Sequence, residues 1–236
     1  MTIRYIWFDL GYTLVYQDRE QVFIRYLTEQ GIDMPKKRIE EAYHLADKYF
    51  MREFPGVLAG DRDTFFPWYL GVLNHLLGLR FHLTEQYRRI REIQQESGAG
   101  WRAFPFAHTV LQRLKERSYG IGLISNWDRT ARDVLAETGL LPLLDEIVIS
   151  SEVGVEKPDR AIFQLALERA GAEPGECLYV GDNYYDDIVG SRQAGMKSCL
   201  INRFGRLGIE ELESVHVILS IQDLPQLSAA ASTIIS

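Results

Sequence analysis

The sequence of 236 residues has only two cysteines, Cys177 and Cys199, and each lies in an apolar run. Two scattered cysteines build neither a disulfide framework nor a zinc site, so both are expected to be buried in a reducing compartment. No apolar run reaches the roughly 18 residues that a membrane-spanning helix needs. The apolar stretch at the start turns polar too soon for a signal peptide. We therefore expect a cytoplasmic protein without membrane contacts.

Positive charge is also scarce. Lys and Arg number 26 against 33 Asp and Glu, which gives a formal net charge of −7. Proteins that bind nucleic acids or anionic membranes need a basic surface to neutralise phosphates, so we expect neither partner. The 46% of hydrophobic and 25% of charged residues are ordinary globular values. This composition excludes a disordered, collagenous or coiled-coil chain.

The spacing of the apolar residues that are present changes near residues 17 and 100. Residues 3–9 form a continuous apolar run with β-branched and aromatic side chains, which is typical of a strand covered on both faces. From residue 17 to 100, apolar residues instead recur three and four positions apart. This spacing predicts amphipathic helices over 21–30, 38–50, 64–79 and 83–96. The simplest account is a bundle of about four helices.

After residue 100, predicted helices alternate with short apolar strands. The strands are expected at 119–125, 146–151, 177–182, 197–202 and 215–219, followed by a helical or disordered tail. Such alternation predicts an α/β fold with a doubly wound parallel sheet. The run at 3–9 resembles these strands and is expected in the same sheet. Residues 1–16 and 101–236 would then form the α/β core, with residues 17–100 inserted after its first strand.

Polar side chains stand where the predicted strands end. Ligands of open parallel sheets bind beyond the carboxyl ends of the strands, so these side chains are candidates for one site. They are Asp9, Ser125, Asn126, Lys157, Asp182, Asp186 and Asp187. A carboxylate can attack phosphorus and form an acyl phosphate, and Mg²⁺ can offset the repulsion between carboxylates and phosphate. Ser125 and Lys157 could stabilise the charge of a transferring phosphoryl group.

Four segments carry a resemblance to a known family. DLGYTL, LISNWD, VEKPD and VGDNYYDDIVGSRQAG resemble, in order and at the expected strand ends, the motifs of the haloacid dehalogenase-like (HAD) hydrolase superfamily. The resemblance covers residues 3 to about 205. It implies a HAD-like Rossmannoid core and identifies the helical insertion with that superfamily's mobile cap of the first type.

The resemblance also implies a metal site. Asp9 would be both the nucleophile and a Mg²⁺ ligand, with Asp182 binding the metal directly and Gly11 contributing its backbone carbonyl. Asp187 or Asp186 would support the metal through water, and the doubled acid leaves the choice between them open.

Three further residues would serve the phosphate and the nucleophile loop. The resemblance implies phosphate contacts from Ser125, from the backbone N–H of Asn126 and from Lys157, which would also hold the nucleophile's carboxylate. Thr13 would steady the loop after the nucleophile. Trp127 directly follows the Ser125–Asn126 turn and is a candidate for the border of the active-site entrance. The aromatic residues of the insertion, Phe65, Phe66, Trp68 and Tyr69, are expected to pack inside the helical bundle.

Gly11 is the main departure from the family pattern. Phosphatases of the superfamily carry a second Asp there, which protonates the leaving group and later deprotonates the attacking water. Such general acid–base help is worth about 10²–10⁴ in rate. Glycine keeps the backbone carbonyl but lacks the acid, so metal binding is expected to survive while acid–base catalysis is weakened.

Three functions stay open. The first is a Mg²⁺-dependent phosphatase acting on a small phosphorylated molecule through an aspartyl-phosphate intermediate. The second is a non-catalytic member that binds phosphate or a partner protein. The third is a hydrolytic 2-haloacid dehalogenase; such enzymes need no metal and carry Tyr two residues after the nucleophile, whereas Tyr12 lies three residues after Asp9. A phospho-accepting receiver domain is disfavoured because it has about half this length. The pattern makes no prediction of the oligomeric state.

Overall fold

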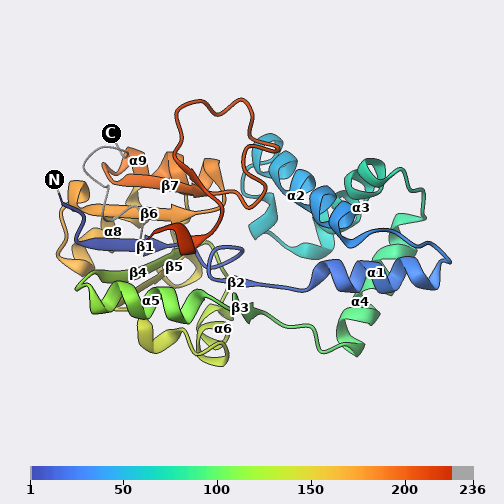
Figure 1. The fold of residues 1–236 in the computed structure, drawn as a ribbon, viewed down its shortest axis with the longest axis horizontal. Helices are drawn as coiled ribbons and strands as arrows, with labels where there is room; N and C mark the ends of the chain where they lie inside the picture. Colours follow the sequence, from blue (N-terminus) through green and yellow to red (C-terminus); the bar gives the residue numbers. More distant parts are fainter. Residues whose placement is uncertain (1, 225–236) are drawn as a thin grey trace. The chain divides into compact units, whose positions relative to one another are not determined.

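The computed structural model describes residues 2–224 and divides into two compact units (Figure 1). The core unit contains the chain up to Tyr16 and from Trp101 onward, and the helical unit is Gln17–Gly100. The tail that was expected to be helical or disordered lies outside the described residues. Among the helices that are described, none combines the length and the apolar character that crossing a membrane would require.

The core unit is built on a six-stranded parallel sheet with the order β5-β4-β1-β6-β7-β8. This sheet confirms the predicted α/β fold class and places the first strand of the chain among the later ones. The strands are β1 Tyr5–Phe8, β4 Gly120–Ser125, β5 Glu146–Ile149, β6 Cys177–Gly181, β7 Lys197–Ile201 and β8 Val217–Ile218.

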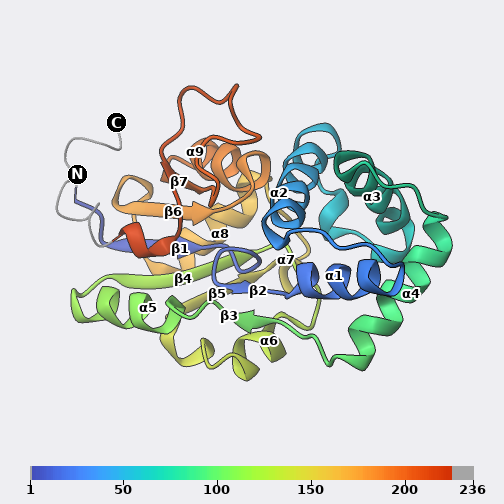
Figure 2. The same cartoon turned by 45° about the vertical axis from the view of Figure 1, so that its right-hand side comes forward.

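Helices cover both faces of this sheet (Figure 2). They are α5 Ala107–Glu116, α6 Ala131–Glu137, α7 Ser150–Val153, α8 Arg160–Ala170 and α9 Gly190–Gln193, with short 3-10 turns at Leu141–Leu143, Pro174–Glu176 and Ile221–Asp223. Alternate side chains of β1 explain the two layers, because Ile6 and Phe8 pack in the cluster that includes α5. Tyr5 and Trp7 pack in the opposite cluster with α8.

Glycine in β4 makes room for these aromatic side chains. A β-carbon at Gly122 would lie 2.3 Å from the Trp7 ring, and one at Gly120 would lie 2.3 Å from the Tyr5 ring. Both cysteines are buried, and burial raises the pKa of Cys177 to about 11 and that of Cys199 to about 12. They therefore behave as small apolar residues of the sheet.

The helical unit contains the four predicted helices, α1 Arg19–Glu29, α2 Lys36–Glu53, α3 Arg62–Leu77 and α4 Leu83–Glu96, and a 3-10 turn at Val57–Ala59. Their apolar faces meet in one separate core. Phe65, Phe66 and Tyr69 are buried there as expected. Trp68 differs, because 43% of it is exposed even though its ring touches those of Phe50 and Phe54.

Two local features were not predicted. The first is an antiparallel pair of two-residue strands, β2 Val15–Tyr16 and β3 Arg102–Ala103, where the chain leaves and re-enters the core unit. Strands of two residues show no hydrophobic periodicity, so their sequence carries no signal. The second is that the helix predicted after β6 begins as a π-helical turn, η4, over Tyr184–Val189.

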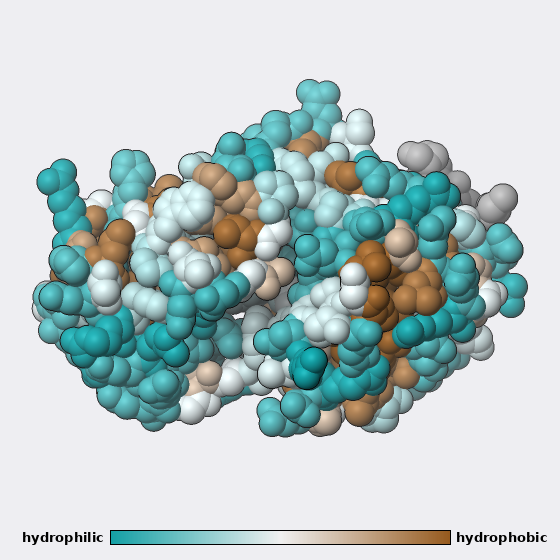
Figure 3. Space-filling model, turned by 180° about the vertical axis from the view of Figure 1, so that it is seen from behind, coloured by the Kyte–Doolittle hydropathy of each residue, from teal (hydrophilic) through white to brown (hydrophobic). Residues whose placement is uncertain are grey.

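Hydrophilic residues predominate on the face of the molecule drawn in Figure 3, and the hydrophobic ones gather in separate groups. This distribution suits the ordinary globular composition of the chain.

Candidate active site

The register of the sheet brings three predicted site residues to one edge. Phe8 of β1 pairs with Leu123 of β4 and with Val180 of β6. Asp9, Ser125 and Asp182 each follow these partners by one or two residues, so they meet at the carboxyl ends of neighbouring strands. The backbone N–H of Asp9 also donates to the carbonyl of Val180 over 2.9 Å, which extends the ladder to the nucleophile position.

Lys157 is the positive charge at this edge. It lies between α7 and α8, is buried, and its Nζ donates to Asp9 Oδ1 at 2.8 Å and to Asp187 Oδ1 at 2.6 Å. Burial favours the neutral amine, but the charges of Asp187 and Asp9 outweigh it and hold the pKa of Lys157 well above its usual value. The side chain is therefore an ammonium ion that bridges two carboxylates.

Ser125 and Asn126 complete the surroundings of Asp9 at the end of β4. Ser125 Oγ donates to Asp9 Oδ1 over 3.1 Å, so the same carboxylate oxygen receives both the serine and the lysine. The Asn126 side chain makes two hydrogen bonds to the backbone of Lys157: its Nδ2 donates to the carbonyl, and its Oδ1 accepts from the N–H. This clamp was not predicted. The phosphate contact from the Asn126 backbone stays a prediction.

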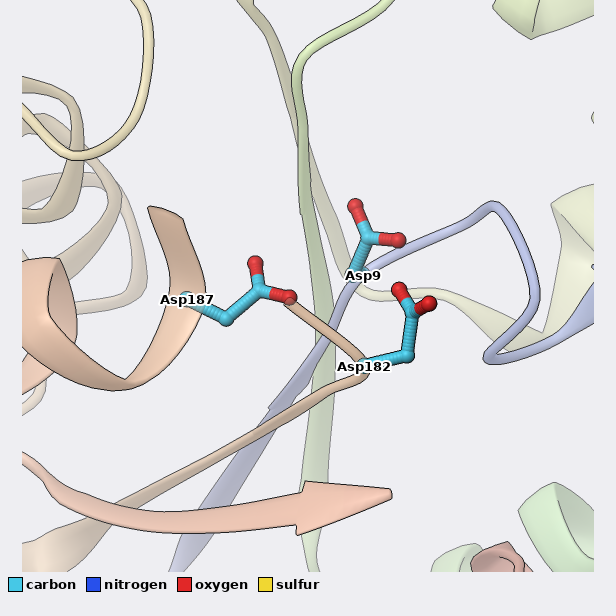
Figure 4. Close-up of side chains that lie close together, drawn as sticks. All are labelled: Asp9, Asp182 and Asp187. Carbon is cyan, nitrogen blue, oxygen red and sulfur yellow. The ribbon is translucent and has the colours of Figure 1, made fainter. Parts of the chain in front are cut away.

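Three carboxylates form the acidic part of the site. Asp9, Asp182 and Asp187 each offer an oxygen within 4.8 Å of the others. Figure 4 shows the carboxylate of Asp187 pointing toward those of Asp9 and Asp182. Asp186 lies outside this group, and its Oδ2 accepts instead from Asn183 Nδ2 at 2.7 Å. Of the two adjacent acids, Asp187 is thus the one beside Asp9.

Close packing fixes the position of Asp187. Its Oδ2 accepts from the Asn183 N–H at 2.9 Å, and its Oδ1 accepts from the Tyr179 hydroxyl at 3.1 Å. Gly181 is required behind it, because a β-carbon there would lie 2.2 Å from Asp187 Oδ2. Gly181 therefore leaves the space that the side chain of Asp187 occupies.

Sequence reasoning missed Tyr179. Its hydroxyl lies 3.0 Å from Lys157 Nζ and 2.8 Å from the carbonyl oxygen of Ile124, and the residue is fully buried in β6. Tyr179 thus ties the lysine to Asp187 and to strand β4. A tyrosine inside an apolar strand indicates packing, and only the tertiary structure shows what its hydroxyl contacts.

The charges of this cluster do not balance. Three carboxylates and one ammonium sum to −3 + 1 = −2. Burial raises the pKa of Asp9, and the charge of Asp187 raises it further, while Lys157 lowers it. Burial and then Asp187 raise the pKa of the adjacent Asp186 to about 7. Hard oxygen donors with excess negative charge are the set that Mg²⁺ prefers, so these residues fit the implied metal.

The loop after Asp9 is held by its own backbone. The Tyr12 N–H donates to the Val15 carbonyl at 2.7 Å, and the Leu14 N–H donates to the Leu10 carbonyl at 2.9 Å. Thr13 is buried, and within the described residues its hydroxyl makes no hydrogen bond. Any steadying by Thr13 therefore comes from packing. The role of the Gly11 carbonyl as a metal ligand stays a prediction.

Comparison with protein families and curated proteins places this chain in a known group. The model of the haloacid dehalogenase-like hydrolase family matches residues 3–195. Haloacid dehalogenase-like hydrolase domain-containing protein 3 of Danio rerio is 26% identical over 230 residues, covering 94% of this chain and 95% of that protein. The pyrimidine 5'-nucleotidase YjjG of Escherichia coli is 39% identical over 125 residues, which cover 52% of this chain and 55% of that protein. A glyceraldehyde 3-phosphate phosphatase of Methanothermobacter thermautotrophicus is 36% identical over 138 residues, which cover 53% of this chain and 57% of that protein.

Solved structures share the fold. The HAD-hydrolase YfnB from Bacillus subtilis, bound to magnesium, has a TM-score of 0.65 at 19% identity and covers 97% of this chain and 99% of its own. The L-2-haloacid dehalogenase RSc1362 has a TM-score of 0.64 at 22% identity, and the match covers 97% of this chain and 100% of that chain. These likenesses show the fold alone, whereas the family model matches the chain from the first strand through the acidic motif after β6. This chain belongs to the haloacid dehalogenase-like hydrolase family.

Proposed function

We propose that this chain is a Mg²⁺-dependent phosphatase that acts on a small phosphorylated molecule through an aspartyl-phosphate on Asp9. One observation carries the proposal: Asp9 lies at once in a group of three carboxylates and in contact with the Lys157 ammonium. A nucleophile, a candidate cation site and a positive charge therefore meet at one point. Two relatives named as a phosphatase and a nucleotidase support the same class of substrate.

In the first step, an oxygen of the Asp9 carboxylate attacks phosphorus and the bond from phosphorus to the leaving oxygen breaks. The electron pair of that bond goes to the leaving oxygen. Lys157 and Ser125, which both contact Asp9 Oδ1, orient the nucleophile and face the charge that spreads over the phosphoryl oxygens. Asp9, Asp182 and Asp187 would hold Mg²⁺, which when bound offsets the repulsion between phosphate and carboxylates.

In the second step, water attacks phosphorus and gives up a proton to solvent, the acyl phosphate breaks at the phosphorus–oxygen bond, and Asp9 returns as a carboxylate. Because Gly11 has no side chain, the leaving oxygen of the first step takes its proton from solvent. The loss is expected to be about 10²–10⁴ in rate for alkyl phosphates, whose leaving groups are basic. Aryl phosphates with acidic leaving groups need no such proton.

We also infer that residues 17–100 act as the cap of this core, as the family resemblance implies. The two buried cysteines suit a reducing compartment, and we propose that the protein works in the cytoplasm.

Steady-state rates test the function. With Mg²⁺, p-nitrophenyl phosphate is expected to turn over at least about 100-fold faster than an alkyl phosphate, and Asp9→Asn is expected to abolish both activities. Equal rates would contradict the weakened acid catalysis. Halide release from 2-chloropropionate without metal would instead identify a dehalogenase, and phosphate binding without turnover would identify a non-catalytic member.

A further inference from the structure

The indole of Trp127 lies where a side chain at position 11 would begin. A β-carbon built on Gly11 would be 3.2 Å from Trp127 Cζ3, which is tighter than most such contacts, and 3.9 Å from Trp101 Cη2. The rings of Trp101 and Trp127 are 4.7 Å apart with planes at 59°. The Tyr12 ring meets Trp101 edge-on at 5.8 Å. The backbone two residues after the nucleophile is therefore lined by aromatic surface.

Hydrogen bonds hold the Trp127 side chain to its own loop and the Trp127 backbone to Ser150. Trp127 Nε1 donates to Thr130 Oγ1 at 3.1 Å, and the Trp127 backbone N–H donates to Ser150 Oγ at 3.1 Å. Two residues earlier in the same segment, Ser125 donates to Asp9. Trp127 and Trp101 are both only half-buried. The pair thus presents an aromatic surface that is still partly open.

The surroundings of Asp9 divide by chemistry. Lys157 and Ser125 contact its carboxylate, and Asp182 and Asp187 form the acidic group beside it, so these polar groups take the charged phosphate and its cation. The carbon skeleton of a substrate gains nothing from such groups. The tryptophan pair beside Gly11 offers it apolar surface with a preference for planar rings.

We propose that Trp127, backed by Trp101, determines leaving-group specificity and selects phosphate monoesters that carry a planar aromatic ring. This inference rests on the proposed phosphatase function and names its substrate class. The ring stacks against the indole, or meets it edge-on, while the phosphate lies on Asp9. Aromatic pairing of this kind is worth about a 2- to 12-fold preference over a non-planar group of similar size.

Benzyl phosphate and cyclohexylmethyl phosphate make the matched test. Both release a primary alkoxide of similar basicity and have similar size, so the missing acid at position 11 slows both to a similar extent and planarity is the main difference. The wild-type protein is expected to favour benzyl phosphate in kcat/KM by about 2- to 12-fold. Trp127→Leu is expected to bring the ratio close to one, and Trp127→Phe, which keeps an aromatic ring, is expected to retain most of the preference.

A second readout separates this inference from the proposed function. Calorimetry with benzylphosphonate and cyclohexylmethylphosphonate, in the presence of Mg²⁺, compares the same two groups without turnover. Circular dichroism and thermal unfolding of each variant check that it is folded. A selectivity ratio near one in the wild type, or an unchanged ratio in a folded Trp127→Leu protein, would overturn the inference. Selective phosphonate binding without hydrolysis of any phosphate ester would support it and contradict the phosphatase.

Discussion

At position 11 the chain has no acidic side chain, and an aromatic ring narrows the room for one. The φ angle of Gly11 is not among the positive ones, so its backbone accepts any residue. The obstacle is Trp127, whose Cζ3 would lie 3.2 Å from the added β-carbon. The indole must shift by a few tenths of an ångström, against its hydrogen bond to Thr130, before an aspartate can fit. The absence of a side chain at position 11 and the position of the Trp127 indole are thus sterically linked.

Restoring the acid is therefore expected to need two substitutions. Gly11→Asp alone is expected to raise kcat/KM for cyclohexylmethyl phosphate by less than about 10-fold, because the indole displaces the new carboxyl group. Gly11→Asp combined with Trp127→Ala is expected to exceed the single variant by about 10-fold or more. Gly11→Ala, which adds the β-carbon without the acid, is the control for crowding. A single variant as active as the double variant would contradict this steric coupling.

The Tyr179 hydroxyl offers a second test at this scale. Its bonds to Lys157, Asp187 and the Ile124 carbonyl are all buried. Tyr179→Phe is therefore expected to lower the free energy of unfolding by about 1–2 kcal/mol and to lower kcat, because it leaves buried polar groups unpaired and loosens the lysine.

Tyr5→Phe is the matched control in the same apolar cluster. The Tyr5 hydroxyl is buried and, within the described residues, has no hydrogen-bond partner. Its removal is expected to leave the free energy of unfolding unchanged or slightly higher. Urea denaturation of the two variants compares them, and equal effects would mean that the Tyr179 hydroxyl contributes nothing through its partners.

Several of the residues that sequence reasoning could find stand at strand ends, because the carboxyl edge of a parallel sheet is a general binding position. Asp9, Ser125 and Asp182 are of this kind. Asn126 and Tyr179 differ, since their contacts depend on which loop and which strand lie beside them. The choice between Asp186 and Asp187 likewise depends on the π-helical turn η4, which the sequence does not signal.

At the scale of elements, one ionic network joins three helices of the helical unit. Arg19 at the start of α1 forms a two-pronged ion pair with Asp47 of α2, with Nη1 3.0 Å from Oδ1. Tyr69 of α3 donates to the same Oδ1 at 2.7 Å. The Arg19 guanidinium also lies 4.5 Å from the centre of the Tyr43 ring. Burial would raise the pKa of Asp47, but Arg19 and Tyr69 outweigh it and hold that pKa below its usual value.

This network predicts a pH-dependent contribution to stability. Because the pKa of Asp47 is lowered by folding, its contribution is present above the ordinary value of 3.8 and is lost as the pH falls below it. Asp47→Asn is expected to cost about 2–3 kcal/mol at pH 7 and at pH 5, because the half-buried Arg19 loses its two-pronged anion and keeps the ion pair of 3.7 Å with Glu20. The difference from wild type is expected to shrink below about pH 4.

Urea denaturation at pH 7, 5 and 3.5 measures this difference. Asp63→Asn is the control, because Asp63 pairs with Arg91 on the exposed surface and its loss is expected to stay within error. A pH-independent difference for Asp47→Asn would mean that the charge of Asp47 is not what stabilises the three helices.

The long helices were predictable because their apolar spacing repeats over several turns. α4 has the predicted bounds, Leu83–Glu96, and its charged face carries ion pairs such as Arg89 with Glu92. The strands β2 and β3 were not predictable, because two residues give no repeat. Their pairing also joins positions 15 and 103, which are far apart in the chain.

At the scale of the whole molecule, part of the excess of acidic residues is concentrated at one place. The formal net charge of −7 predicts that the surface as a whole disfavours polyanionic partners, while three of the acids converge on one edge of the sheet. Their mutual repulsion costs free energy in the folded protein and is absent once the chain unfolds. A bound divalent cation would turn this cost into a gain.

The stability of the core unit is therefore expected to depend on Mg²⁺. At a concentration 100 times its Kd, a ligand that binds only the folded state stabilises it by about 2.7 kcal/mol, or about 5–10 °C in Tm for a chain of this size. Asp182→Asn is expected to show the opposite pattern, with a Tm equal to or above that of wild type without Mg²⁺ and almost no gain with it. The substitution relieves repulsion and removes a ligand at the same time.

Differential scanning calorimetry with Mg²⁺, with EDTA and with Na⁺ at equal ionic strength separates specific binding from screening. Asp133→Asn, an exposed acid of α6 outside the acidic group, keeps the net charge of the Asp182→Asn protein and is expected to retain the full response to Mg²⁺. An equal gain in Asp182→Asn and Asp133→Asn would place the cation elsewhere. No gain in the wild type would remove Mg²⁺ from the site and with it the electrostatic reason for grouping Asp9, Asp182 and Asp187.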